Sequence, residues 1–165
     1  AHAAVVPHRD TDARPIAIER HLDPARALGR QDERAIEQRH VEGHVFVSPA
    51  TEQVADQRVW MRANGTLPDD PLVHDAVLAY ASDLTLLDTS ALPHAISWWS
   101  EKLQTASLDH AMWFHRQFRA DEWLLYAQES PRAAGARGFN RGSIFTRAGE
   151  LVASVAQEGL IRLRS

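Results

Sequence analysis

Apolar side chains are densest between Asp69 and Leu87, where they recur at helical spacing. Asp70 can accept a hydrogen bond from an early helical N–H, and Pro71 suits the first helical position. The apolar residues fall on nearly every face of this segment, which is typical of a buried helix rather than a surface helix. The sequence therefore predicts one long central helix over residues 69–87.

One carboxylate interrupts the apolar pattern of this helix. Asp83 shares a stripe with Ala76, Tyr80 and Leu87. A carboxylate on such a stripe loses hydration unless it is paired or hydrogen-bonded, and the later part of a helix disfavours negative charge. A residue that breaks the local pattern is a candidate functional residue. The alternative is that Asp83 caps a following turn or pairs with a structural arginine.

Beyond residue 106 the pattern changes to the alternation of β-strands. We expect an earlier strand over residues 58–63, ended by the Asn64-Gly65 turn, and later strands over residues 107–115, 122–130, 137–146 and 151–164. The last two are joined as a hairpin by Arg147–Glu150. Consecutive strands at this spacing favour an antiparallel sheet. One buried helix with such a sheet predicts an α+β domain in which the sheet curls around the helix.

Two polar residues stand out on the expected strands. Gln157 falls on the apolar face of the last strand, the face that turns toward the helix. Ser107 opens the first of the late strands, where it would share a face with Asp109, Ala111 and Trp113. The alternative for Gln157 is a buried amide that satisfies a backbone group, and for Ser107 a turn or cap residue.

The N-terminal part of the chain is polar and lacks periodicity. Residues 1–14 are typical of a tail or linker, and residues 15–165 are expected to form a single domain. Within that domain, residues 23–43 form a polar extension that favours a solvated helix. Short strands are expected at residues 16–19 and 45–47.

Composition excludes several classes of protein. A chain of 165 residues suits one domain with a sizeable core, and its formal net charge of −4 implies no general nucleic-acid surface. The sequence has no cysteine, which excludes disulfides, thiolate nucleophiles and cysteine-based zinc sites. No run approaches the roughly 18 apolar residues of a membrane helix, and no stretch resembles a signal peptide. We expect a cytoplasmic protein whose partners are neither nucleic acid nor membrane.

Common catalytic motifs are also missing. The sequence contains no Gly-x-Ser-x-Gly, no Gly-x-x-x-x-Gly-Lys and no His-Glu-x-x-His, so a serine hydrolase, a P-loop protein and a zincin have no support. His40 and His44 have the spacing of a metal pair, but Gly43 weakens a helical turn there and no third ligand is near. We interpret both as surface histidines and expect neither a metal nor a cofactor.

Several ordered motifs resemble the acyl-CoA thioesterase II family. They are Trp60–Asp70 (WMRANGTLPDD), Tyr80–Leu84 (YASDL), Leu108–His115 (LDHAMWFH), Glu122–Tyr126 (EWLLY) and Leu151–Leu160 (LVASVAQEGL). The resemblance covers about two thirds of the chain, from near Gln57 to Arg162. Residues before Gln57 match poorly, and residues 23–43 look like an extension that the family does not usually have.

The resemblance implies a hotdog fold, in which a curled antiparallel sheet wraps a long central helix. Members of the family usually carry two hotdogs in one chain, and this sequence resembles the second. It would therefore pair with another hotdog domain, either as a homodimer through a sheet edge or with a missing first half.

The resemblance also implies a lipid-metabolism hydrolase that converts fatty acyl-CoA to free fatty acid and CoA with an activated water. Its catalytic residues map by motif onto Asp83, Ser107 and Gln157. Ser107 stands where the family more often has threonine, and the hydroxyl is kept. We expect Asp83 to act as the base, made more basic by its apolar stripe, while Ser107 and Gln157 hold the water.

Three arginines near one turn are candidates for binding the CoA phosphates. Arg132, Arg137 and Arg141, around the turn that holds Gly135 and Gly138, could bind the phosphates; the alternative is solvated loop charges.

The alternative function is a non-catalytic acyl-CoA-binding or structural hotdog subunit that needs a partner. A hotdog dehydratase has less support, because it would need a histidine where the helix offers Asp83.

Overall fold

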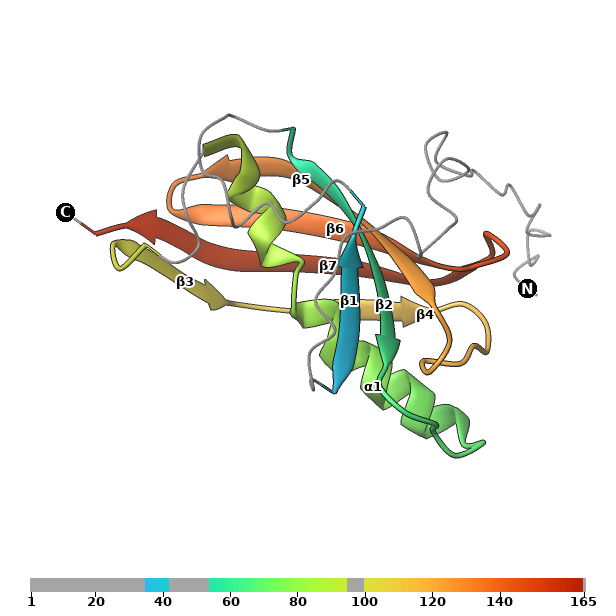
Figure 1. Cartoon of the computed structure of the whole chain (residues 1–165). Coiled ribbons are helices and arrows are strands. Elements are labelled where there is room, and N and C mark those ends of the chain that lie inside the picture. Colours follow the sequence, from blue (N-terminus) through green and yellow to red (C-terminus); the bar gives the residue numbers. More distant parts are fainter. Residues whose placement is uncertain (1–34, 42–53, 95–99, 165) are drawn as a thin grey trace, which may run out of the picture.

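The computed structural model describes residues 35–41, 54–94 and 100–164 of the chain. Within these residues the strands form a single antiparallel sheet in the order β1-β2-β5-β6-β7-β3, and β4 also pairs with β7 (Figure 1). The strands are β1 (Ile36–His40), β2 (Asp56–Ala63), β3 (Leu103–Ser107), β4 (Ala111–Phe114), β5 (Leu124–Ala134), β6 (Arg137–Thr146) and β7 (Leu151–Leu163). The helical elements are α1 (Pro71–Asp83) and the two 3₁₀ turns η4 (Leu87–Ser90) and η5 (Leu92–His94).

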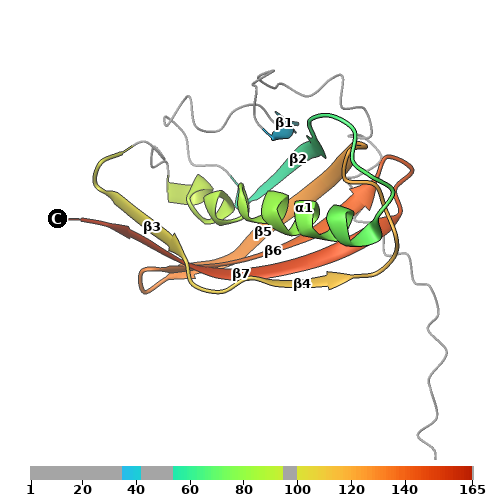
Figure 2. The ribbon, with the colours of Figure 1, turned by 90° about the horizontal axis from the view of Figure 1, so that it is seen from below.

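The sheet is curled, and α1 lies against its concave face (Figure 2). We call this face the inner face and the opposite one the outer face. Side chains of Leu78 and Ala81 on the helix pack with Tyr126, Ile144 and Val155 of the sheet in one buried cluster. Burying a side chain of this size is worth about 1.5–3 kcal/mol, so this cluster holds the two layers together. The predicted α+β class is confirmed.

The start of α1 agrees with the sequence, and its end does not. Asp70 caps the helix by accepting a hydrogen bond from the Leu72 N–H at 3.0 Å, and Pro71 occupies the first position. The helix ends at Asp83 rather than near Leu87. The chain then tightens into η4, because Thr89 and Ser90 point their hydroxyls into the sheet and bond side chains there.

Two glycines on the sheet let η4 lie directly on backbone. A Cβ atom at Gly159 would overlap the side chain of Leu87, and one at Gly138 would overlap that of Ser90. The glycines therefore set how closely the segment after α1 approaches β6 and β7.

Among the described residues, the sheet buries one side of α1. His74, Leu78, Ala81 and Ser82 face the sheet, whereas Ala76, Tyr80 and Asp83 are exposed. The predicted burial on nearly every face is therefore wrong, because the sheet covers a single side of the helix. Exposed large side chains on the other side include Leu72 at 75% and Tyr80 at 60%.

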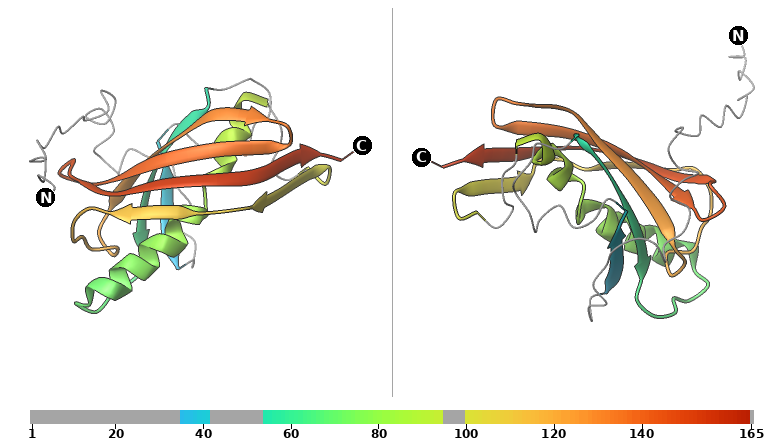
Figure 3. Two further views of the ribbon diagram at one scale, coloured as in Figure 1. Left: turned by 180° about the vertical axis from the view of Figure 1, so that it is seen from behind. Right: turned by 45° about the horizontal axis from the view of Figure 1, so that its top comes forward.

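The strand expected over residues 107–115 is two strands, β3 and β4, which follow one another along β7 (Figure 3). Ser107 pairs with Gly159 and Ala111 pairs with Ala156, so four steps on one side (107 to 111) oppose three on β7 (159 to 156). The extra residue reverses the alternation of side chains, as a bulge does. Ser107 therefore does not share a face with Ala111.

The other strand predictions fare better. The strand over residues 137–146 is confirmed as β6, and those over 58–63, 122–130 and 151–164 are confirmed with shifted ends. The hairpin between β6 and β7 is confirmed, with Gly149 at φ 84° in its turn. Asn64-Gly65 does leave β2 in a bend, with Gly65 at φ 101°.

The polar extension is partly described. Residues 36–40 form strand β1 on the edge of the sheet, so a solvated helix is wrong there. His40 is buried at 3% exposure rather than on the surface. The expected tail over residues 1–14, the short strands at 16–19 and 45–47, and His44 lie outside the described residues.

In the part of the chain that the structure describes, no three His, Asp or Glu side chains gather as metal ligands would. No helix among these residues is long and apolar enough to cross a membrane.

Candidate active site

The structure brings Asp83, Ser107 and Gln157 together from three elements. Ser107 Oγ donates to Asp83 Oδ1 at 3.0 Å. Gln157 Nε2 donates to the same Oδ1 at 2.6 Å and to Ser107 Oγ at 2.7 Å. Asp83 ends α1, Ser107 ends β3, and Gln157 lies on the adjacent strand β7. We call these three residues, which the motif resemblance predicts to be catalytic, the catalytic group.

The three hydrogen bonds hold one oxygen of the Asp83 carboxylate in place and do not engage the other oxygen. Gln157 has two amide hydrogens and Ser107 has one, and these bonds use all three. They converge on Asp83 Oδ1, directly or through Ser107. Among the described residues Asp83 Oδ2 has no hydrogen-bond partner. The group thus presents a positioned carboxylate with one oxygen available to a ligand or a water.

Exposure differs across the group. Gln157 is fully buried, and its Oε1 has no partner among the described atoms. The side chain of Asp83 is 50% exposed, so the prediction of a desolvated carboxylate on an apolar stripe is wrong for this chain. Asp83 and Ser107 line a cavity of about 440 Å³ together with Tyr80, Leu108 and His110.

His110 and Ser82 extend this cluster. The Nε2 atom of His110 lies 2.8 Å from Ser82 Oγ, and its Nδ1 atom lies 3.9 Å from Asp83 Oδ1. The break between β3 and β4 permits this position, because it turns His110 out of strand alignment toward α1. Neither residue was predicted from the sequence; the available signal was a histidine three residues after Ser107 in the LDHAMWFH motif.

The three arginines expected to bind phosphate do not join the catalytic group. In the β6–β7 register Asn140 pairs with Gln157 and is buried, so its neighbour Arg141 points to the outer face. Arg137 lies two positions away from Phe139 on that outer face, and Arg132 pairs with Phe139 across the strands. All three are therefore on the side of the sheet opposite the catalytic group, and their role in CoA binding stays a prediction.

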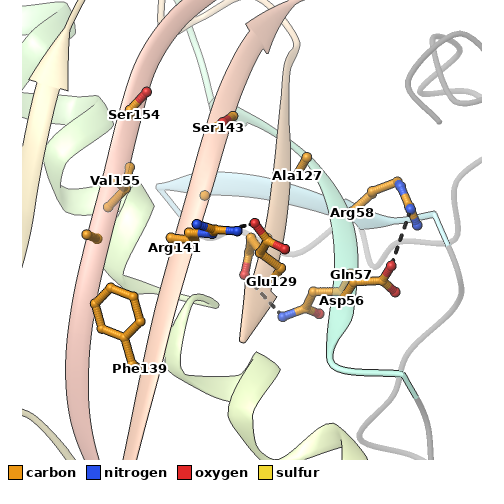
Figure 4. A pocket seen from close by; sticks show the side chains of 13 residues that line it. Asp56, Gln57, Arg58, Ala127, Glu129, Phe139, Arg141, Ser143, Ser154 and Val155 are labelled. Carbon is orange, nitrogen blue, oxygen red and sulfur yellow. Dashed lines mark hydrogen bonds and ion pairs between the residues drawn. The ribbon is translucent and has the colours of Figure 1, made fainter. Parts of the chain in front are cut away.

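Figure 4 shows the groove that contains Arg141, with a volume of about 580 Å³. Arg141 forms an ion pair with Glu129, and Arg58 lies 3.6 Å from Asp56. The groove exceeds the cavity at Asp83 in volume, but it holds no residue of the catalytic group and its charges neutralise one another in pairs. It is not the site of the chemistry that Asp83 offers.

A second set of polar side chains is buried beneath η4. Gln57 Nε2 donates to Thr85 O at 3.0 Å and lies 2.9 Å from Thr89 Oγ1, while Gln128 Nε2 donates to Thr85 Oγ1 at 2.7 Å. Gln57 Nε2 also reaches Gln128 Oε1 at 3.1 Å. We call these four residues the Gln57 network. The sequence analysis did not single out any of them.

Two further titratable groups lie in the interior near Asp83. Burial, followed by the charge of Asp83, raises the pKa of Asp88 on η4 well above its usual range. The same two causes, in the same order, raise the pKa of Tyr126 on β5. Both shifts favour the neutral side chain.

Comparisons with known proteins show the family of this chain. The family model described as acyl-CoA thioesterase matches residues 30–160. This chain belongs to the acyl-CoA thioesterase family. Human acyl-coenzyme A thioesterase 8 is 46% identical over 110 residues, which cover 66% of this chain and 34% of that protein. The family model begins at residue 30, before the predicted start near Gln57, while the human relative covers the two thirds of the chain that the motifs predicted.

Solved structures give the fold. Acyl-CoA thioesterase II TesB2 from Mycobacterium marinum matches with a TM-score of 0.74 and 45% identity, over 100% of this chain and 60% of that one. A protein from Alicyclobacillus acidocaldarius described as having a hot dog fold matches with a TM-score of 0.64 at 15% identity, over 100% of this chain and 57% of that one. The predicted hotdog fold is confirmed. The chain spans about a third of the length of the human relative, as one hotdog half would.

Proposed function

We propose that this chain hydrolyses acyl-CoA thioesters with a water molecule that Asp83 activates. The observation that carries the proposal is the catalytic group, in which Ser107 and Gln157 hold one carboxylate oxygen of Asp83 and leave the other facing a cavity. Membership of the acyl-CoA thioesterase family supports the choice of substrate.

The chemistry needs few groups. Water attacks the thioester carbonyl while Asp83 Oδ2 takes one of its protons, and the C–S bond then breaks. The departing thiolate recovers that proton; a thiol with a pKa of about 8.5 leaves without strong acid assistance. No covalent intermediate is needed, in keeping with the absence of a nucleophile motif. Ser107 and Gln157 orient the base, whereas the sequence analysis had them hold the water.

A second hotdog domain is part of this proposal. The exposed side of α1 carries Leu72 and Tyr80, the exposed Leu84 follows the helix, and the nearby strand β4 exposes Phe114. An apolar surface of this kind suits a protein partner rather than water. The site opens toward the same side, so a hotdog seated there would enclose Asp83. Either a second copy of this chain or the other half of a longer protein would fit.

The test is release of thiol from a medium-chain acyl-CoA. We expect Asp83→Asn to lower turnover by at least about 1,000-fold, because the amide cannot accept the proton of water. The matched control is Asp75→Asn, which changes the same residue type on the same helix outside the catalytic group. Circular dichroism should show both variants folded.

Two results would contradict the proposal. Near-normal turnover in Asp83→Asn would remove the role of this residue. Binding of acyl-CoA without turnover, at chain concentrations high enough for pairing, would favour the alternative of a non-catalytic subunit. The lack of cysteine means that the protein itself does not react with the thiol reagent.

A further inference from the structure

His110 occupies a position in the cavity that the proposed mechanism does not yet use. Its side chain is 22% exposed and lies between Ser82 and Asp83, two neighbouring residues at the end of α1. It comes from the connection between β3 and β4, which both ends anchor to β7. The position of the ring is therefore set by the same strand that carries Gln157.

The bonds of Ser82 indicate which ring nitrogen carries the hydrogen. The Ser82 hydroxyl has one hydrogen to donate, and its Oγ atom lies 2.9 Å from Ala79 O, a carbonyl one turn back on the helix. With that hydrogen donated to the carbonyl, Ser82 Oγ accepts from His110 Nε2. In a neutral imidazole the hydrogen is then on Nε2, and Nδ1 is an acceptor.

That acceptor faces the base. Nδ1 lies 3.9 Å from Asp83 Oδ1, which is too far for a direct hydrogen bond and suits two groups that share a water. Asp83 Oδ1 already accepts from Ser107 and Gln157, so Asp83 Oδ2 and the neighbouring His110 Nδ1 are left as acceptors for a water within reach of both residues. A water molecule has two hydrogens to direct toward them.

We propose that His110 is a further catalytic residue, whose Nδ1 atom accepts a hydrogen bond from the hydrolytic water while Asp83 removes the other proton. This inference rests on the proposed thioester hydrolysis. One O–H bond of the water breaks toward Asp83 as the new C–O bond forms. The second hydrogen remains on the product acid, the C–S bond breaks, and the proton on Asp83 goes to the thiolate. Ser82 is a positioning residue, because it acts through the ring.

Two substitutions separate the two ring nitrogens. Glutamine at this position can place an amide N–H near the site of Nε2 and keep the bond to Ser82, but it offers no acceptor at the site of Nδ1. Asparagine can place its oxygen near the site of Nδ1 and loses the bond to Ser82. We expect His110→Gln to lower kcat about 10- to 100-fold, because the water is no longer oriented. His110→Asn should retain most of the activity, with KM little changed in both.

The chain supplies a matched control for these variants. His115 Nε2 lies 2.9 Å from Ser154 Oγ, a second histidine–serine pair on the same sheet edge with no residue of the catalytic group as its partner. His115→Gln should leave kcat unchanged. A loss equal to that of His110→Gln would mean that these histidines act through the stability of the edge, and would overturn the inference.

A measurement of the tautomer completes the test. Nitrogen chemical shifts of His110 in the wild-type chain should report hydrogen on Nε2 and a bare Nδ1, and the opposite tautomer would overturn the inference. Equal kcat values for His110→Gln and the wild type would overturn it while leaving the thioesterase proposal intact. No turnover by the wild-type chain at any concentration would overturn both.

Discussion

The catalytic group and the Gln57 network are both polar clusters on the inner face of the sheet, and they differ in how they end. In the Gln57 network four neutral side chains bond one another and the backbone, and each is at most 4% exposed. In the catalytic group two neutral side chains direct their hydrogens onto a carboxylate whose side chain is 50% exposed.

The difference separates the glutamine that we propose to serve chemistry from the one that does not. Gln57 and Gln157 are both buried, and in each the Oε1 atom lacks a partner among the described atoms. What separates them is the acceptor of their N–H groups: a backbone carbonyl and neutral oxygens for Gln57, a charged and accessible carboxylate for Gln157. Burial of a polar residue alone therefore does not mark a site, whereas a network that ends on an open charge does.

The largest effect is expected on turnover, when the hydrogen bonds of Gln157 are removed. Gln157→Leu removes both hydrogen bonds that orient Asp83 and Ser107, and we expect kcat to fall about 100-fold, or about 2.7 kcal/mol. The free energy of unfolding should change by less than about 1 kcal/mol, because an unpaired buried oxygen leaves together with the donors. Steady-state kinetics and urea unfolding on the same samples check both numbers. An unchanged kcat would place Gln157 with the structural amides.

The same substitution in the other cluster should act in the opposite way. Gln57→Leu leaves the Thr85 carbonyl without its donor, and an orphaned buried acceptor costs about 1–3 kcal/mol. We expect a lower urea midpoint and an unaltered kcat for the folded fraction. A fall in kcat at constant stability would show that the two clusters act as one.

The smallest effect concerns Asp88, the buried carboxyl next to both clusters. Burial raises the pKa of Asp88 in the folded protein. The contribution of Asp88 to the free energy of unfolding is therefore fully present below its unfolded pKa of 3.8, and it is lost as the pH rises through its folded pKa. Asp88→Asn should therefore stabilise the protein at pH 7, because the amide carries no charge to desolvate. At about pH 3 the two proteins should unfold at the same urea concentration. A destabilised variant at pH 7 would contradict the assigned burial.

Much of the fold could be predicted from the sequence, because it depends on local signals. Asp70 and Pro71 mark the start of α1, and period-2 alternation identifies β7. The motif resemblance supplied Asp83, Ser107 and Gln157, and the structure places these residues in contact. Two of them were also visible as polar intrusions in apolar patterns.

The remaining features depend on contacts between distant segments. The break between β3 and β4 is defined by a one-residue offset against β7, and alternation within a single segment cannot reveal it. Exposure of the Asp83 stripe reflects what covers the helix, which periodicity does not report. Arg141 was assigned from its distance to a turn, whereas the face of the sheet it occupies follows from register.

The close contact of Gly159 with Leu87 has a consequence for precision. Gly159 pairs with Ser107 and lies two residues from Gln157, while Leu87 follows Asp83 by one helical turn. Because Gly159 has no side chain, Leu87 packs directly on the backbone of β7, and this contact sets the distance between the helix side and the sheet side of the site. A methyl group added at Gly159 would push Leu87 away from β7 and shift the Asp83 carboxylate relative to Ser107 and Gln157. The smallest residue in the chain therefore controls how precisely the site is aligned.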